Sequence, residues 1–262
     1  MRNFITFSAL FFLMLILSTC ASTGFREYYK PFYDGVIFSE EAYLKEGETP
    51  QVIKASNIDS ELREIASNWY LCIGCSGFNG VEMGSTEINA ALTSLCKEKK
   101  AKIAVWTKVY TNTKNGVYSV PQTNYHTYTN AYGYISSYTT TTYSTHSYSV
   151  ERYDFEAYLF VEIPTNYKDM FAPGISVREL NQEDRDQYKQ NTGCLINVVY
   201  KNTPAYFANL SYGDIITAVN GIPMFTAENY INYKKGIKKG DDFELTIIRN
   251  GAEKKIKLKY AL

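Results

Sequence analysis

The stretch from Gly193 to Gly221 constrains the fold most, because several residues with special backbone preferences follow one another within it. It opens with a mainly apolar run, Gly193 to Val199, which reads as a strand. Pro204 then suits the first turn of a helix, where a missing N–H costs nothing. Asn209 follows, and asparagine tolerates the left-handed backbone better than other non-glycine residues. The stretch therefore predicts a strand, a short helix and a left-handed turn in close succession.

Further elements are predicted on both sides of that stretch. Asn181 caps a helical turn, because Asp184 stands three residues further on. Asn250-Gly251 strongly favours a hairpin between two strands. The other expected elements are strands over 174–180, 243–249 and 254–259 and a helix over 227–235.

With Gly213-Asp214-Ile215-Ile216 and Val219-Asn220-Gly221 added, the pattern resembles a PDZ domain. The resemblance is to PDZ domains of bacterial envelope proteins and of high-temperature-requirement-type serine proteases, and it covers residues 171–262. It implies a PDZ-like, partly open β-barrel with two helices. In that family a peptide lies as an added strand between the first strand and the second helix, and a turn of backbone N–H groups holds its terminal carboxylate.

The resemblance also implies which residues form the peptide-binding groove. The turn corresponds to Ala172, Pro173, Gly174 and Ile175, and the walls to Ile175, Val177, Ala227, Tyr230, Ile231 and Lys234. Ordinary core packing explains Ile175, Val177 and Ile231 equally well. A solvated helix face is the alternative for Lys234.

Pro173 departs from the family pattern, in which a large apolar residue with an N–H stands at this place. Proline has no backbone donor, and a hydrogen bond to a charged group is worth about 1.5–3 kcal/mol. Its loss weakens capture of a C-terminal carboxylate by more than about tenfold. Internal segments, a weak ligand or a vestigial groove remain open.

The N-terminus reads as a targeting segment over residues 1–20. The apolar run Phe4 to Leu17 is shorter than the ~20 residues of a membrane span. It is followed by Cys20, and the junction resembles a bacterial lipoprotein signal, in which this cysteine is lipidated. Since Thr19 departs from that motif, secretory cleavage after Ala21 and an uncleaved anchor stay open. No Asp follows Cys20, so the resemblance favours the outer membrane.

The residues between this segment and the PDZ-like part predict a small α/β sandwich over 51–166, so the chain as a whole is expected to be α+β. Residues 21–50 read either as a tether or as an irregular segment that packs through aromatics such as Phe25. The expected elements are strands over 51–54, 70–75, 101–110 and 153–163, helices over 58–68 and from Ser85, and a turn over 76–80.

An insertion over residues 115–150 contains no Lys, Arg, Asp or Glu and is rich in Tyr and Thr. Both residue types favour extended backbone, which predicts a long hairpin or a floppy insertion. Three interpretations compete: a loop that has drifted in composition, an adhesive surface that uses tyrosine as antibody paratopes do, and a self-associating strand.

Cys72 and Cys75 form a C-x-x-C spacing inside an apparent buried strand. Thioredoxin-like chemistry places such a pair at a helix N-terminus, and residues three apart on a strand point to opposite faces. Small buried hydrophobes are the better interpretation. Whether Cys72, Cys75, Cys96 and Cys194 pair as disulfides stays open.

Composition excludes several function classes. Equal numbers of acidic and basic residues, 27 each, argue against nucleic acid as a partner. With 2 His and no serine-protease nucleophile loop, neither a protease site nor a metal or cofactor site is expected. The sequence thus predicts a non-catalytic envelope lipoprotein, tethered to the membrane by its lipid, that binds a peptide or protein partner. The alternatives are an accessory of a separate envelope protease and a structural or adhesive surface protein.

Overall fold

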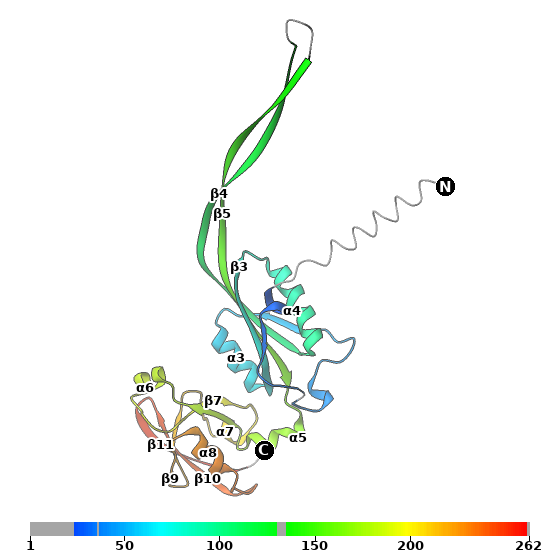
Figure 1. The fold of residues 1–262 in the computed structure, drawn as a ribbon. Helices are drawn as coiled ribbons and strands as arrows, with labels where there is room; N and C mark the ends of the chain where they lie inside the picture. Colours follow the sequence, from blue (N-terminus) through cyan, green and yellow to red (C-terminus); the bar gives the residue numbers. More distant parts are fainter. Residues whose placement is uncertain (1–23, 36, 130–134, 261–262) are drawn as a thin grey trace, which may run out of the picture.

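Two open β-sheets follow one another along the chain (Figure 1). The structure, a computed structural model, describes residues 24–35, 37–129 and 135–260. The first sheet has the strand order β1-β3-β5-β4-β2, and the second has the order β11-β10-β8-β7-β6, with β9 beside β8. The expected mixed α+β class is confirmed. The predicted leader with Cys20 lies outside the described residues.

The first sheet consists of β1 (Tyr29–Pro31), β2 (Gln51–Lys54), β3 (Tyr70–Val81), β4 (Ile103–Thr129) and β5 (Ile135–Glu162). Among the described strand pairs of this sheet, β2 and β4 run parallel and the others antiparallel. The helices around it are α2 (Gly24–Glu27), η1 (Glu40–Ala42), α3 (Ile58–Ser67), α4 (Ser85–Lys99), α5 (Thr165–Lys168) and η2 (Asp169–Phe171). None of the described helices has the length and apolar character needed to cross a membrane.

The first core lies under α4, whose buried Ile88 and Leu92 meet Trp106 and Phe155 of the central strands. A smaller cluster fills the opposite face under α3, which begins where the Asn57 side chain accepts a hydrogen bond from the N–H of Ser60 at 2.9 Å. The sheet therefore has a helix on each face, as a small α/β sandwich requires.

The segment before β2 packs on this core rather than forming a tether over its described part. Phe25 is fully buried, with ring centroids 5.0 Å from Phe78 and 6.1 Å from Phe155. β1 pairs with β3, through Tyr29 opposite Ser76. Of the two interpretations of residues 21–50, the packed one describes this region.

The predicted turn over residues 76–80 is wrong, because these residues continue β3. They pair with β5 in unbroken register, from Ser76 opposite Ala157 to Gly80 opposite Tyr153. Phe78 stacks on Phe155 at 5.1 Å. Cross-strand aromatic contacts of this kind stabilise a sheet and here outweigh the turn preference of the glycines.

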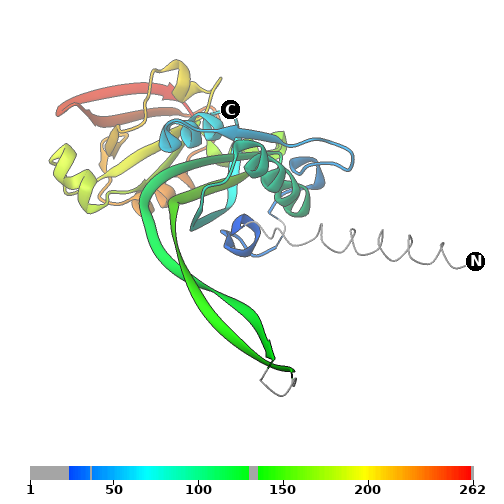
Figure 2. The ribbon, with the colours of Figure 1, turned by 90° about the horizontal axis from the view of Figure 1, so that it is seen from above.

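β4 and β5 continue beyond the body as a long two-stranded hairpin (Figures 1 and 2). Their register runs without a break from Asn112 opposite Arg152 to Thr129 opposite Ile135. A bulge at Thr111 marks the point where the hairpin leaves the body. Of the two expected forms of the insertion, the structure shows the hairpin.

The second sheet consists of β6 (Ile175–Glu179), β7 (Cys194–Val199), β8 (Ile215–Val219), β9 (Ile222–Pro223), β10 (Asp242–Arg249) and β11 (Ala252–Lys259). Its helices are α6 (Gln182–Tyr188), α7 (Pro204–Phe207) and α8 (Ala227–Lys234). The local predictions hold here: Asn181 and Asp184 form a capping box, Asn209 is left-handed with φ 57°, and Asn250 and Gly251 turn the β10–β11 hairpin.

The two halves share an interface around Trp69. Its indole stacks on Tyr200 at 4.4 Å and meets the edge of Phe171 at 6.2 Å. The N–H of Lys201 donates to the carbonyl of Ser67 at 2.9 Å, and its ammonium pairs with Glu64. These contacts hold the second sheet against the first.

Candidate functional site

The candidate site lies between β6 and α8. Among the described strands β6 pairs only with β7, so its other edge is unpaired in this part of the chain. α8 packs against both strands. An unpaired strand edge with a helix beside it can accept an extended segment as an additional strand.

Two hydrogen bonds fix α8 antiparallel to β6. At one end the N–H of Ala227 donates to Glu179 Oε1 at 2.8 Å. At the other end Lys234 Nζ donates to the carbonyl of Met170 at 3.0 Å. The helix is thus attached to the last residue of β6 and to the segment that precedes the strand. Glu179 was missed by sequence reasoning, because a single exposed glutamate gives no signal of a bond to a helix 48 residues away.

The structure separates the nine predicted groove residues into two groups. The accessible group consists of Ile231, which is 44% exposed, and of Val177 and Lys234, which are half-buried. The remaining six are buried: Ala172, Pro173, Gly174, Ile175, Ala227 and Tyr230. Ile175, Ala227 and Tyr230 belong to the core of the second sheet, so three side chains are left to line a site.

The turn before β6 has its own backbone bonds. The N–H of Ala172 donates to the carbonyl of Asp169 at 3.2 Å, and that of Gly174 to Phe171 at 2.7 Å. Pro173 between them has no N–H. None of these three residues therefore offers an unused backbone donor to a carboxylate.

Glycine is the only residue type that fits at position 174. Its φ is +103°, and a Cβ there would lie 2.1 Å from Oγ1 of Thr203. Thr203 caps α7 and donates to the carbonyl of Tyr200 at 2.7 Å. Any side chain at residue 174 would displace this cap, so a substitution there would disturb the fold as well as the site.

Tyr230 faces the core instead of the site. Its side chain meets Phe243 edge-on at 6.5 Å, and its hydroxyl has no hydrogen-bond partner among the described residues. Burial, followed by the nearby Cys194, holds the pKa of Tyr230 well above its usual range. This hydroxyl is a buried polar group with no hydrogen bond to offset its loss of hydration, and it is not placed to donate to a ligand.

The charges around the site fall into two sets. Two bidentate ion pairs hold the scaffold, Arg178 with Asp184 and Arg249 with Asp214. Lys234 instead stands at the end of α8, where burial lowers its pKa. Among the described residues no group of three or more His, Cys, Asp or Glu side chains is placed to hold a metal ion.

Residues 173–260 match the family model described as PDZ domain. The second sheet and its helices form a PDZ domain. Over 87 residues the chain is 28% identical to a "Probable periplasmic serine endoprotease DegP-like" from Ectopseudomonas mendocina (strain ymp), covering 32% of this chain and 18% of that protein. For the protein of the same name from Pseudomonas putida (strain GB-1) the identity is 31% over 80 residues, covering 30% and 17%. The chain thus spans less than a fifth of these curated relatives, and the match falls on the PDZ part.

The sequence identity to solved structures is lower than to these curated relatives. One is "HtrA-type protease AlgW with decapeptide", with TM-score 0.32, 17% identity and coverage of 40% of this chain and 37% of that one. Another is the HtrA3 PDZ domain bound to a phage-derived ligand (FGRWV), with TM-score 0.30, 21% identity and coverage of 33% and 80%.

Proposed function

We propose that this chain is a non-catalytic protein of the bacterial cell envelope that binds an extended peptide segment by adding it to the edge of β6. The observation that carries this proposal is the placement of α8 along an unpaired strand edge, held at both ends by Glu179 and Lys234. The backbone edge would supply hydrogen bonds to any sequence, and Val177 and Ile231 would supply an apolar wall.

The ligand is an internal segment or one held by a side chain, because the turn at residues 172–174 has no unused backbone donor. Lys234 stands at this end of the site. One of its three donors reaches Met170, so others remain for a carboxylate. A ligand with a carboxylate here, from an Asp or Glu side chain or from a chain end, matches this charge.

The envelope location rests on the predicted lipidation of Cys20 and on the relatives, whose names describe periplasmic proteins. The resemblance of the same leader to a lipoprotein signal supports our further proposal of a lipid anchor in the outer membrane. The relatives are also named endoproteases, which supports the alternative of an accessory to a separate envelope protease. The exposed hairpin favours a second function, a structural or adhesive role.

The test is a peptide-array experiment with the full chain and an Ile231→Asp variant. Ile231 is 44% exposed, so the substitution changes the site wall without opening the core. Val81→Asp is the matched control, since Val81 is 50% exposed on the first sheet. Peptides that bind the parent and the control, and bind the Ile231→Asp variant at least tenfold more weakly, support the proposal. Equal binding by all three proteins contradicts it.

A further inference from the structure

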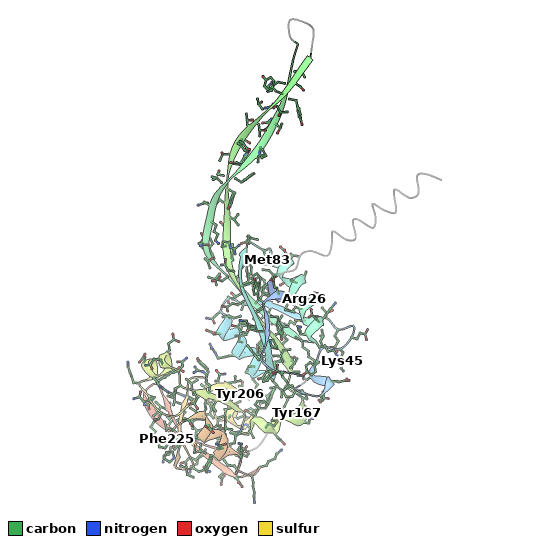
Figure 3. The ribbon with its side chains drawn as sticks, in the orientation of Figure 1. Arg26, Lys45, Met83, Tyr167, Tyr206 and Phe225 are labelled. Atoms are coloured by element: carbon green, nitrogen blue, oxygen red, sulfur yellow. The ribbon has the colours of Figure 1, made fainter. Side chains whose placement is uncertain are left out.

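The outer edge of β5 is unpaired along the whole described hairpin. β3 pairs with β5 only as far as Val81 opposite Arg152, and β2 pairs with β4 only as far as Lys54 opposite Trp106. Beyond these points β4 and β5 have only each other among the described strands. The ribbon extends roughly 60 Å at about 3.3 Å per residue, and Figure 3 shows its side chains standing clear of the body beyond Met83.

Such an edge is a template for pairing, and proteins usually protect it with charges or proline. Residues 115–150 contain no Lys, Arg, Asp or Glu. From Asn115 to Thr129 β4 has one protecting residue, Pro121. A proline in a strand is tolerated where its nitrogen faces away from the partner strand, so Pro121 interrupts the outer edge of β4. β5 has neither a proline nor a charge from Ile135 to Val150. The two edges of the hairpin are therefore unequal, and β5 is the unprotected one.

The hairpin also lacks a covering layer. Its described side chains are exposed on both faces, including Tyr125 at 80% and Val117 at 70% on one face and Tyr118 at 53% on the other. A two-stranded ribbon by itself is marginal in water, and additional strands stabilise it. The register across the ribbon is nevertheless fixed by the body, where β4 and β5 are neighbouring inner strands of the sheet.

We propose that two copies of this chain pair along their β5 edges in antiparallel orientation, giving a four-stranded sheet in the order β4-β5-β5-β4. The partner has to offer an extended edge of similar length and equally free of charge, and the second copy's β5 has these properties. A strand that pairs antiparallel with itself forms a two-fold, self-complementary interface, which is the commonest symmetry of oligomers. The interface lies on the first sheet and does not depend on the peptide site at β6.

Disulfide trapping tests this geometry. Single cysteines are placed in turn at each residue from Ser137 to Thr145 on β5, with the parent chain as control for its native cysteines. One position lies nearest the two-fold axis, so dimer formation under mild oxidation should peak there and fall on both sides. Cysteines at Ser119, Thr123 and Thr127 on β4 should give no dimer. In the proposed sheet the two β4 strands lie about 14 Å apart, beyond the ~7 Å Cα separation that a disulfide spans.

Charge substitution gives a second, independent test. Ser137→Lys with Thr141→Lys places two like charges on the β5 edge of each copy, which brings like charges together across the proposed interface and is destabilising. The matched control is Thr123→Lys with Thr127→Lys, whose charges lie about 14 Å apart across the axis, beyond the Debye length of about 10 Å at 0.1 M salt. Thr123 faces Thr141 and Thr127 faces Ser137 on the ribbon, so the β4 variant places two lysines at the same spacing and directly opposite the β5 positions.

Sedimentation equilibrium of the full chain gives the readout. The dissociation constant of the dimer should rise at least tenfold in the β5 variant, fall back partly at 0.5 M salt, and stay near the parent value in the β4 variant. A parent chain that is monomeric at tens of micromolar and forms no trapped dimer would overturn the proposal. So would trapping at β4 equal to that at β5, or an equal effect of the two lysine variants.

Discussion

Trp69 stacks on Tyr200 with ring centroids 4.4 Å apart, and its indole N–H donates to the carbonyl of Lys201 at 3.2 Å. Trp69 belongs to the loop before β3, whereas Tyr200 follows β7 of the PDZ domain. Phe171, just before the turn that precedes β6, meets Tyr200 edge-on at 5.0 Å. One aromatic cluster therefore joins the first sheet, the PDZ domain and the beginning of the candidate site.

Replacing Trp69 with alanine should destabilise the chain by somewhat less than the ~3–5 kcal/mol lost when a fully buried tryptophan is truncated, because Trp69 is half-buried in a packed cluster. Trp69→Phe keeps part of the stack and loses the indole donor, so it should cost less, about 1 kcal/mol for the hydrogen bond. Urea denaturation followed by circular dichroism measures both. An alanine variant no less stable than the phenylalanine variant would show that the cluster does not join the two halves.

Removing the hydroxyl of Tyr230 should stabilise the protein. The Tyr230→Phe substitution eliminates a buried polar group that has no partner among the described residues, and leaving such a group unpaired costs about 1–3 kcal/mol. Thermal unfolding should show a higher midpoint for this variant. Tyr233→Phe, at a half-buried neighbour on the same helix, is the control and should change the midpoint little. A lower midpoint for Tyr230→Phe would indicate that the hydroxyl is in fact satisfied.

Acid should weaken the PDZ domain through Asp184. Arg178, as the main cause, holds the pKa of this carboxyl below its usual value. A carboxyl with a lowered folded-state pKa contributes stability above its unfolded value of about 3.9, and that contribution is lost as the pH falls through the folded-state value. Asp184→Asn should therefore lose less stability than the parent between about pH 5 and pH 2. Asp186→Asn, on the exposed side of α6, should follow the parent curve in the same urea titrations.

Three of the thiols should be slow to react in the native protein. Burial raises the pKa of Cys72, Cys96 and Cys194 to about 12 each. Because the thiolate is the nucleophile and a free thiol has a pKa of about 8.5, alkylation at pH 8 should slow by roughly three orders of magnitude relative to the unfolded chain. Mass spectrometry after timed iodoacetamide treatment measures this. Rapid labelling of Cys72, or a disulfide between Cys72 and Cys75, would contradict this prediction and support a redox role for the pair.

Lys234→Met should weaken binding of carboxylate-bearing peptides by about tenfold or more, since a charge-assisted hydrogen bond is worth about 1.5–3 kcal/mol. Lys235→Met removes the same charge from the next residue, whose ammonium donates to Asn232 at 2.9 Å, and should leave affinity unchanged. Fluorescence titration with paired peptides, one amidated at its end and one with Asp or Glu replaced by amides, identifies which carboxylate Lys234 meets. Equal loss in both lysine variants would point to a general effect of net charge.

Sequence reasoning succeeded where the determinant is local. Asn57 and Asn181 cap helices through bonds that span three residues, and Asn209 and Asn250 take up positive φ as their residue type predicts. It failed where the determinant is a distant contact. The glycines of residues 76–80 predict a turn, and the contact between Phe78 and Phe155 that keeps this segment in a strand is not visible in the local sequence. The sequence around Phe25 likewise gives no local signal that this side chain is completely buried.

The candidate site shows the same division. The missing donor at Pro173 is a property of one residue and was predictable. The bonds that use the N–H groups of Ala172 and Gly174 depend on how the turn closes, which no residue type reveals. The inward orientation of Tyr230 depends on the rotation of α8 over the core, and both orientations fit the sequence pattern.

Val198 and Tyr200 belong by sequence to the PDZ domain, yet their side chains complete the core of the first sheet. In a fragment that begins at residue 173, where the family match begins, these two side chains would be exposed to solvent. It would also leave Phe171 and Trp69 behind on the other piece. The set of residues that share one core is therefore larger than the PDZ domain and includes part of the first sheet.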